Sequence, residues 1–413
     1  MSLATGRPEL RVGVVGLGWM GQVHARALSR VLHHYPDAPY LPRLVAVADT
    51  AAGDRTRQVA AAYGFEHVLA DWRDLVVRDD VDLVCVTGPN AIHRDVAVAA
   101  AQAGKNVWVE KPAGRNAGET GEIVAAVEAA DVQSAVGFNY RNAPAVEHAR
   151  DLVAAGRIGR VEHATVRFRA DYSAHPDGAR TWRFVNEHAG TGVLGDLVSH
   201  AADLARHVVG NINEVVVDTA TFITERPAAA AATSHFARGG DGPKEPVENE
   251  DYVSALLRFA DGSRGILESS RAAVGDQCTY ELEVHGTTGA LAWDFRRMGE
   301  LRVCLDQDYQ DASYSTLLVS PGLGELSSFQ PGSGIAMGYD DLKVIEAHRL
   351  LLSIESGKPH GATVHDALVA ARTVEAMARS AADRRWTSLA ESLETTRPSA
   401  PHEAPVQSQG DPR

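Results

Sequence analysis

Short apolar runs alternate with amphipathic stretches along the first 140 residues. The runs are almost continuous in Val, Leu and Ala, as in strands buried on both faces of a sheet, and they occupy residues 10–16, 44–49, 81–88, 107–110 and 135–138. Helical spacing of apolar residues is found between them, at 20–30, 51–63, 92–103 and 117–130. Strands that alternate with helices in this way predict an α/β fold with a Rossmann-type, doubly wound parallel sheet.

The pattern changes after residue 140. Residues 160–170, RVEHATVRFRA, alternate like a strand with one solvated face, and further strands are expected at 214–224, 251–259, 264–270, 280–285 and 291–294. Helical spacing returns at 145–155, 339–356 and 364–383. We therefore expect a C-terminal α+β part with a largely antiparallel open sheet of about five or six strands.

Two stretches have an irregular composition. Residues 226–250 combine an alanine run with GGDGPKEP, which predicts a mobile loop between two strands. Residues 396–413 are polar and proline-rich, which predicts a disordered tail. The chain is therefore expected to form one domain at 8–140 and a second at 141–395, followed by the tail.

Composition and charge narrow the class of protein. The 413 residues are 45% apolar and 23% charged, as in ordinary globular proteins, and no apolar run has the length of a membrane span. The net charge of −14 disfavours nucleic acid as a partner. Cys85, Cys278 and Cys304 lie far apart without metal-ligand spacing, and the N-terminus does not resemble a secretion signal. These features predict a cytoplasmic protein without a metal site.

A glycine-rich turn follows the first predicted strand and opens the first helix. Its residues are Gly16, Leu17, Gly18, Trp19, Met20 and Gly21. Gly16 permits a tight turn, Gly18 lets the backbone approach a pyrophosphate, and Gly21 lets the helix pack closely on the strand. The free N–H groups of the helix N-terminus would face the phosphates. Such turns also occur for structural reasons alone, but this position in a βαβ unit predicts a bound dinucleotide.

Asp49 ends the second predicted strand, where an acid can bind the ribose hydroxyls of the dinucleotide. It lies 28 residues beyond Gly21, and residues 33–42 are interpreted as a loop extension that accounts for the excess over the usual spacing of about 20 residues. Because a carboxylate repels a 2′-phosphate, NAD is favoured over NADP. Two alternatives stay open: Asp49 as a cap of the following helix, and the use of NADP.

Three further motifs carry polar residues in a fixed order. They are Thr87-Gly-Pro-Asn90 with His93, then Glu110-Lys111-Pro112 at the end of the fifth predicted strand, then Gly192-Val-Leu-Gly-Asp196-Leu-Val-Ser-His200. The end of a parallel strand is where such sheets bind ligands. With the glycine turn, these motifs make residues 10–390 resemble the Gfo/Idh/MocA family of oxidoreductases, named after glucose–fructose oxidoreductase, inositol dehydrogenase and a rhizopine-catabolism protein.

The resemblance implies roles for individual residues. The catalytic set of the family corresponds to Lys111, Asp196 and His200. Its cofactor contacts add to the glycine turn and Asp49 the residues Thr87, Asn90, His93, Glu110, Lys111 and Asn139. Its substrate pocket corresponds to the three catalytic residues together with Tyr140 and Arg141.

The residues themselves support part of this assignment. Asp196 and His200 are four residues apart, so a helix places them on one face, where the acid can orient the imidazole as a general base. The opposite face of that helix is apolar and consists of Leu197, Ala201, Leu204 and Val208. The alternative is a solvated face with an incidental ion pair, to which we assign Asp203 and His207.

The segment that precedes the catalytic helix supplies candidates for the pocket wall, namely Tyr172, His175, Arg180, Trp182 and Arg183. Aromatic rings and guanidinium groups suit the apolar faces and hydroxyl edges of sugars and cyclitols, and similar segments line the pocket in the family. A buried Trp with surface arginines is the alternative. A sugar, glycoside or inositol-like polyol is therefore the expected substrate.

The expected activity is an NAD-dependent dehydrogenase that converts a secondary alcohol to a ketone. His200 would accept the hydroxyl proton and Lys111 would donate a hydrogen bond to the same oxygen, so that the rate rises with pH through the imidazole pKa. Two other functions stay open: redox-neutral, NAD-dependent glycoside cleavage, and a non-catalytic NAD-binding sensor. Residues 252–257 leave neither face of the second sheet clearly polar, so a homodimer or homotetramer through that sheet is expected.

Overall fold

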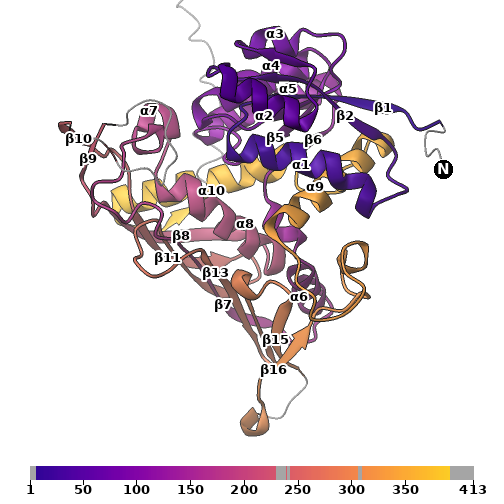
Figure 1. The fold of residues 1–413 in the computed structure, drawn as a ribbon. Coiled ribbons are helices and arrows are strands. Elements are labelled where there is room, and N and C mark those ends of the chain that lie inside the picture. Colours follow the sequence, from indigo (N-terminus) through magenta and orange to yellow (C-terminus); the bar gives the residue numbers. More distant parts are fainter. Residues whose placement is uncertain (1–5, 229–238, 240–241, 306–308, 391–413) are drawn as a thin grey trace, which may run out of the picture.

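The computed structural model describes residues 6–228, 239, 242–305 and 309–390, and these residues form two large sheets, one in each half of the chain (Figure 1). The disordered tail predicted at 396–413 lies outside the described residues, as does most of the centre of the loop predicted at 226–250. The described ends of that loop pair as a short hairpin of β9 (Glu225–Pro227) and β10 (Lys244–Pro246).

The first sheet is parallel throughout and has the strand order β3-β2-β1-β4-β5-β6. Its strands are β1 (Glu9–Val15), β2 (Leu41–Ala48), β3 (His67–Leu69), β4 (Leu83–Val86), β5 (Asn106–Val109) and β6 (Ser134–Val136). The helices of this half are α1 (Trp19–His34), α2 (Asp54–Tyr63), α3 (Trp72–Val76), α4 (Asn90–Gln102) and α5 (Ala117–Ala130). The predicted Rossmann sheet is confirmed. The short edge strand β3, which is only partly buried, carries no apolar run and was not predicted.

The second sheet is mixed and has nine strands in the order β16-β15-β14-β13-β7-β12-β11-β8-β17. They are β7 (Val161–Arg169), β8 (Ile212–Ala220), β11 (Tyr252–Phe259), β12 (Arg264–Ser270), β13 (Thr279–Gly286), β14 (Ala290–Asp294), β15 (Glu300–Cys304), β16 (Ser315–Leu318) and β17 (Thr387–Ser388). All neighbours are antiparallel except β7 and β12. The predicted class is confirmed. The predicted size of five or six strands was too small, because β15 to β17 lie at the edges and are short.

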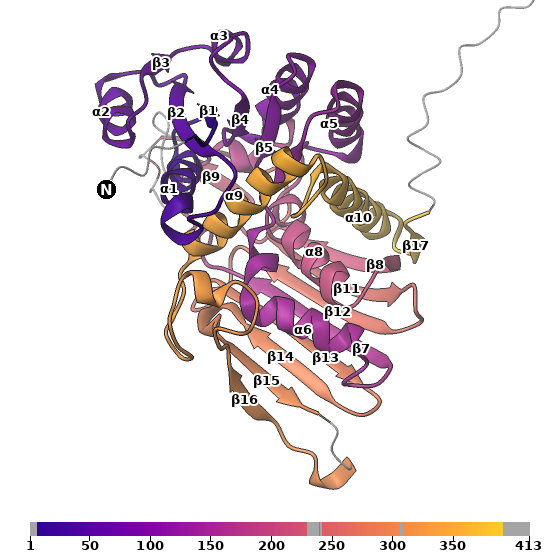
Figure 2. The ribbon, with the colours of Figure 1, turned by 90° about the vertical axis from the view of Figure 1, so that its right-hand side faces the viewer.

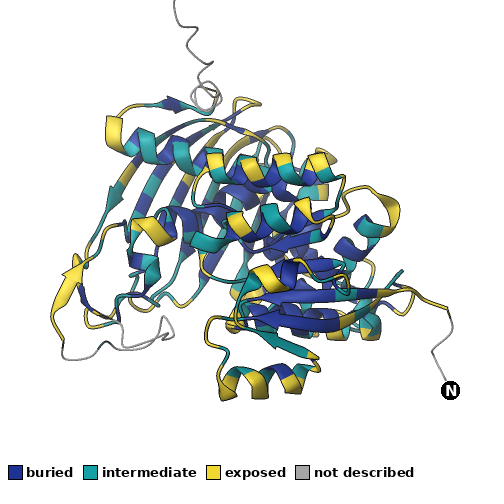
Figure 3. Ribbon diagram, turned by 90° about the horizontal axis from the view of Figure 1, so that it is seen from above, coloured by how far each residue is buried: buried dark blue, intermediate teal, exposed yellow. Residues whose placement is uncertain are grey.

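Helices cover one face of the nine-stranded sheet. Figure 2 shows α6 (Pro144–Ala154), α8 (Ser199–Val208) and α10 (Val364–Asp383) in front of it, and each of them contacts its strands. Figure 3 shows that exposed residues gather on the outer sides of the helices, while the strands behind them are largely buried. No helix among the described residues combines the length and apolarity that crossing a membrane requires.

The last two helices pack against both halves of the chain. In α9 (Tyr339–Ser356), Val344 and Leu351 belong to the apolar core of the first sheet, whereas Leu342 belongs to the core of the second. Helix α10 likewise places Val364 in the first core and Met377 in the second. Helices α9 and α10 therefore pack against both sheets. The predicted boundary between the two domains, after residue 140, stays a prediction.

Candidate active site

The glycine turn between β1 and α1 is a close backbone approach. Gly16 has φ +90°, and a Cβ there would overlap the backbone of Gly88 at the end of β4. A Cβ at Gly21 would overlap the carbonyl of Gly16, whereas Gly18 faces open space. The Thr87 hydroxyl donates a hydrogen bond to the Gly16 carbonyl at 2.7 Å. The turn therefore leaves a cradle beside Gly18 at a helix N-terminus, and this fits a pyrophosphate.

Asp49 follows β2 and braces this turn. Its Oδ2 accepts a hydrogen bond from the Leu17 N–H at 2.8 Å, and its Oδ1 accepts one from the Ala51 N–H at 2.8 Å. The next helix, α2, begins after Gly53 without a side-chain cap, so Asp49 does not cap it. The carboxylate therefore stands beside the glycine turn, where it fits the ribose of a dinucleotide better than a 2′-phosphate.

A cleft of about 220 Å³ lies between the two halves of the chain. From the first half it is lined by the predicted residues Trp19, Met20, Thr87, Asn90, His93, Glu110 and Lys111. Tyr140, at the boundary between the halves, also lines it, and from the second half it is lined by Tyr172, Trp182, Arg183, Asp196 and His200. Predicted residues from both halves therefore converge on one cavity, whereas the predicted cofactor residues Gly16, Leu17, Gly18, Gly21, Asp49 and Asn139 are not part of its lining.

Lys111 and Asp196 form an ion pair across this cleft. The Lys111 Nζ lies 2.8 Å from Asp196 Oδ1 and 2.9 Å from the Asp196 carbonyl oxygen. The Tyr172 hydroxyl donates to the other carboxylate oxygen, Asp196 Oδ2, at 2.5 Å. Burial opposes ionisation of Asp196, but the charges of Lys111 and Arg183 hold the pKa of that carboxyl well below its usual range. The carboxylate is thus ionised and fixed from both sides.

His200 lies beside this pair without binding to it. Among the described residues no side chain hydrogen-bonds to the His200 ring, although the Tyr280 hydroxyl donates to the His200 carbonyl at 2.7 Å. Residues Leu194–Val198 form a π-helical turn before α8, and Asp196 in this turn and His200 in α8 both line the cleft. Burial, and then the positive charge of Lys111, lower the pKa of His200 well below its usual value, so the imidazole is neutral at pH 7.

Some predicted residues lie elsewhere. The Arg141 guanidinium does not line the cleft, because its Nε binds Asp203 Oδ2 at 2.6 Å and its Nη2 contacts Asp366. Asp203 is only 4% exposed, so the prediction of a solvated face was wrong for this residue. His175 and Arg180 also lie outside the cleft lining, and Arg180 pairs instead with Glu245 and Glu248.

Several predicted cofactor residues make structural hydrogen bonds. Asn90 Nδ2 donates to the Ala189 carbonyl at 3.0 Å and thereby links the two halves of the chain. Both ring nitrogens of His93 lie 2.9 Å from backbone carbonyls, those of Pro112 and Gly88. Asn139 is fully buried beside the Tyr339 hydroxyl. Asn90 and His93 line the cleft and Asn139 does not, and the contact of all three with a dinucleotide stays a prediction.

Sequence reasoning did not single out Phe168, Arg271 or Tyr339, which also line the cleft. Phe168 and Arg271 lie in and just after strands that were predicted for their alternation alone. Tyr339 begins α9, and its ring stacks on Trp19 with centroids 5.4 Å apart. Nothing local to these residues marks them, because their place in the cleft depends on the packing of segments far apart in the sequence.

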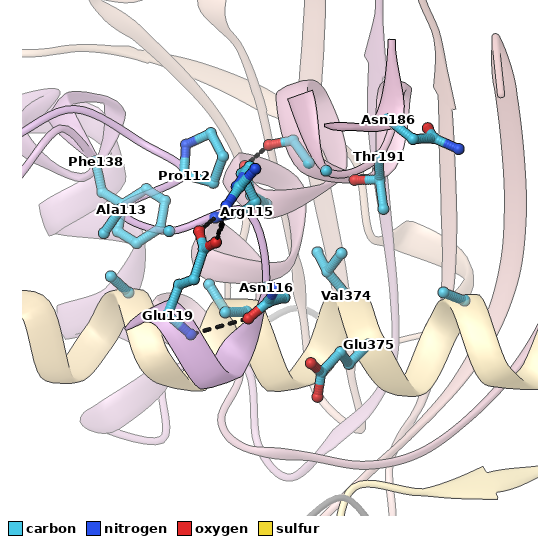
Figure 4. Close-up of a pocket in the computed structure, with 18 residues that line it drawn as sticks. Pro112, Ala113, Arg115, Asn116, Glu119, Phe138, Asn186, Thr191, Val374 and Glu375 are labelled. Atoms are coloured by element: carbon cyan, nitrogen blue, oxygen red, sulfur yellow. Dashed lines mark hydrogen bonds and ion pairs between the residues drawn. The ribbon is translucent and has the colours of Figure 1, made fainter. Parts of the chain in front are cut away.

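Figure 4 shows a second, larger cavity of about 410 Å³, which is lined by residues of both halves of the chain. Its lining includes Pro112, Gly195 and Ser199, each adjacent in sequence to a catalytic candidate, but none of the three candidates themselves. Figure 4 shows the Arg115–Glu119 ion pair above the helix that carries Val374 and Glu375, which is α10. Lys111, Asp196 and His200 therefore line the cleft between the two halves of the chain and do not line this cavity. Among the described residues there is no cluster of His, Cys, Asp or Glu that could hold a metal ion.

Comparison with known proteins gives consistent results for both halves. Residues 10–138 match the oxidoreductase family with an NAD-binding Rossmann fold, and residues 146–292 match the GFO/IDH/MocA C-terminal domain. The chain is 34% identical over 381 residues to levoglucosan dehydrogenase of Pseudarthrobacter phenanthrenivorans, covering 92% of this chain and 97% of that one. It is 29% identical to inositol 2-dehydrogenase of Rhizobium meliloti, covering 92% and 99%. A structure of levoglucosan dehydrogenase in complex with NADH and levoglucosan superposes with a TM-score of 0.86 at 32% identity, covering 92% and 99%.

Proposed function

The chain belongs to the Gfo/Idh/MocA family of oxidoreductases, and from this premise we propose that it uses NAD⁺ to oxidise a secondary hydroxyl of a sugar or cyclitol to a ketone. The observation that carries the proposal is the 2.8 Å contact between Lys111 and Asp196, which joins the two halves of the chain in one cleft beside His200. The proposal agrees with the similar proteins, which include an inositol 2-dehydrogenase and a levoglucosan dehydrogenase solved in complex with NADH and levoglucosan.

The glycine turn contributes Trp19 and Met20 to the lining of the cleft, and Asp49 braces the turn through the Leu17 N–H. Gly16, Gly18 and Gly21 would hold the pyrophosphate, and Asp49 would hold the adenosine ribose. When bound, NAD⁺ supplies the hydride acceptor. The protein contributes orientation and control of the proton, and both depend on the side chains that face the cleft.

His200 is the proton acceptor in this proposal. Its imidazole is neutral at pH 7 because burial and Lys111 lower its pKa, and its ring lines the cleft without a hydrogen-bond partner among the described side chains. A free ring nitrogen can therefore accept the hydroxyl proton of the substrate as the carbonyl forms. Phe138 and Tyr140 contact the ring edge-on and fix its plane.

Lys111 stabilises the developing negative charge on the substrate oxygen. An ammonium has three N–H donors, and two of those of Lys111 bind the carboxylate and carbonyl of Asp196. The third is left for the hydroxyl that reacts. Asp196, held by Tyr172, orients Lys111 and can accept a hydrogen bond from a neighbouring substrate hydroxyl.

For the substrate we propose an uncharged six-membered ring polyol, either a pyranose such as an anhydrosugar or an inositol-like cyclitol. The cleft carries aromatic rings from Phe168, Tyr172 and Trp182, which can pack on the apolar faces of a sugar. The Arg183 guanidinium stacks on Trp182 at 4.4 Å from the ring centroid and presents donors to hydroxyl groups. The likeness to levoglucosan dehydrogenase over 92% of this chain supports this choice.

The test is a screen of levoglucosan, free pyranoses, glycosides and inositols with NAD⁺ and with NADP⁺, read by absorbance of the reduced cofactor and by NMR of the product. The proposal predicts accumulation of NADH with one substrate class and formation of a ketone. Cleavage of a glycoside without net NADH would support the redox-neutral alternative. Binding of NAD⁺ without turnover of any member would support the sensor.

We also propose that the open face of the nine-stranded sheet joins copies of the chain into a homodimer or homotetramer. Leu256 and Ile266 are both 50% exposed and face each other across β11 and β12. Two apolar side chains side by side on an outer sheet face are typical of a covered surface. Light scattering should give a multimeric mass, which Leu256→Asp with Ile266→Asp should reduce; a monomeric mass in the parent protein rejects this proposal.

A cytoplasmic location is the last part of the proposed function. The three cysteines are free, and their thiols are found far apart in the fold, as expected in a reducing compartment. Immunodetection after cell fractionation tests this location, and a periplasmic or secreted pool would contradict it.

A further inference from the structure

A polar cluster lies beside Lys111, and Glu110 is its one member that also lines the cleft among the described residues. It consists of His24 on α1, Trp108 and Glu110 at the end of β5, and Lys343 and Glu346 on α9; we call it the buried cluster. Lys343 Nζ donates to Glu110 Oε1 at 2.5 Å and to Glu346 Oε1 at 2.9 Å. None of the four charged or titratable side chains is more than 8% exposed.

Two further hydrogen bonds complete the buried cluster. His24 Nε2 lies 2.9 Å from Glu110 Oε1, and Trp108 Nε1 donates to Glu346 Oε1 at 2.7 Å. The rings of His24 and Trp108 stack with centroids 3.8 Å apart. Apolar side chains of the same volume could fill this space at equal or greater stability, because burying ions is costly. The cluster therefore calls for a reason other than stability.

The position of Glu110 supplies that reason. Its Oε2 accepts a hydrogen bond from the backbone N–H of Lys111 at 3.3 Å, so the carboxylate that Lys343 holds lies directly against the catalytic residue. His24 is on the helix that the glycine turn opens, and Tyr339, one turn before Lys343, lines the cleft and stacks on Trp19. One carboxylate thus links the cofactor helix, the catalytic lysine and α9.

Charge gives a second link to the reaction. The charged groups that act on His200 are Lys111, Glu110, Asp196 and Lys343, and the charges of Glu110 and Lys343 oppose each other there. The groups that face Lys343 are Glu110, Glu346, Tyr339, His24 and Cys85. Burial lowers the pKa of His24 to about 4, so Lys343 is the cation that balances Glu110 at neutral pH.

We propose that Lys343 is a positioning residue for the dehydrogenase: it holds Glu110 against the backbone of Lys111 and cancels the charge of that carboxylate at His200. This inference rests on the proposed function. Without the ammonium, Glu110 either stays ionised and favours the protonated imidazole, or takes up a proton itself near neutral pH. Either event changes the charge beside Lys111 and His200, and it therefore moves the acidic limb of the pH–rate profile to higher pH.

The experiment compares Lys343→Met with Lys105→Met. Lys105 is a matched control because it is also buried, at 8% exposure. Its Nζ donates to the carbonyls of Arg78 and Val81, which precede β4 at the opposite edge of the sheet from Glu110. We expect Lys343→Met to lower kcat/KM about 10- to 100-fold, with kcat falling more than KM rises, and to move the acidic limb of the pH profile upward by about 1 pH unit. Lys105→Met should lose stability but keep both kcat/KM and the pH profile.

A rescue variant separates charge from packing. Lys343→Met with Glu110→Gln removes both charges and should return the acidic limb of the profile toward that of the parent, and Lys343→Arg should keep it. If Lys343→Met does not fold, the double variant must still fold and must show the acidic limb of the parent protein. A double variant that also fails to fold would mean that the cluster serves packing alone, and it would overturn the proposal. A folded Lys343→Met with unchanged kcat and pH profile also overturns it.

The outcomes are distinguishable from failure of the proposed function. If the parent protein forms no NADH with any sugar or cyclitol, the proposed function itself is wrong. If the parent is active and Lys343→Met matches it, only the role of Lys343 is wrong.

Discussion

Glu110 and Lys111 are neighbours in the chain, yet they belong to ion clusters of opposite character. Lys111 pairs with Asp196 at the edge of the cleft, where the two side chains keep 16% and 31% exposure. Glu110 pairs with Lys343 in the dry interior, where exposure is 8% and 0%. Both pairs join the two halves of the chain. We call Lys111–Asp196 the open pair and Glu110–Lys343 the closed pair. Only the open pair leaves a donor and a carboxylate that a ligand can reach, so the open pair is suited to catalysis and the closed pair to positioning Lys111.

Removing Lys111 should give the largest effect on catalysis. Lys111→Met deletes the donor to the reacting oxygen, so we expect kcat/KM to fall by a factor of about 10² to 10⁴ with little change in melting temperature. NADH formation under initial-rate conditions measures it. Lys358→Met, at an exposed lysine, is the control and should match the parent. Activity retained in Lys111→Met would remove the open pair from the mechanism.

For the free energy of unfolding, substitution in the closed pair should have a larger effect than substitution in the open pair. Glu110→Gln leaves a buried ammonium beside a neutral amide, and we expect it to lower the free energy of unfolding by about 3 kcal/mol. Asp196→Asn, in the pair with 16% and 31% exposure, should lower it less, by about 1 kcal/mol. Denaturant titration of both variants tests the contrast. Equal losses would mean that the open and closed pairs do not differ in the way their burial indicates.

The pH dependence should also distinguish the two regions. Because burial and Lys111 lower the pKa of His200, the base is already unprotonated at pH 7, and the acidic limb of the alcohol-oxidation profile should lie below the ordinary histidine range. The sequence-based prediction of a rise with pH through the imidazole pKa is kept, and the structure places that rise at lower pH. Measuring kcat/KM from pH 5 to 9 tests it, and a limb centred at about 6.5 would contradict the lowered pKa.

The smallest effect concerns Glu346 in the buried cluster. Burial raises the pKa of this carboxyl to about 7, above its ordinary value of 4.5. Between these two values the folded protein binds the proton more tightly than the unfolded chain, so stability is present at low pH and falls as pH rises through 7. The slope should reach about 1 kcal/mol per pH unit. Glu346→Gln should flatten it in thermal melts recorded from pH 5 to 8, and an unchanged slope would assign the pH dependence to other groups.

The sequence predicted the elements that have strong periodicity. The helices expected at 339–356 and 364–383 match α9 and α10 residue for residue, and the apolar runs correspond to β1, β2, β4, β5 and β6. It missed β3, β15 and β16, which are short and lie at or next to sheet edges, where alternation over three to five residues is too brief to recognise. It also took Asp196 and His200 as neighbours on an α-helix, because nothing in Gly192 to His200 indicates a π-helical turn.

The site could be predicted in part for a physical reason. A glycine turn and a strand-end acid or lysine are local features, and the end of a parallel strand is a ligand position in any such sheet. The ion pairs of Arg141 could not be predicted from local features, because its partners Asp203 and Asp366 are 62 and 225 residues away in the sequence.

The sequence by itself determined the two kinds of sheet, the glycine turn, and the residue types available at the strand ends, because these follow from spacing between near neighbours. The tertiary structure decided which side chains meet. Lys343 reaches Glu110 across 233 positions and Asp196 reaches Lys111 across 85, and both contacts exist because α9 and the π-helical turn pack against the end of β5. Such contacts depend on how whole helices and strands pack, and the pattern of side chains along one segment does not predict them.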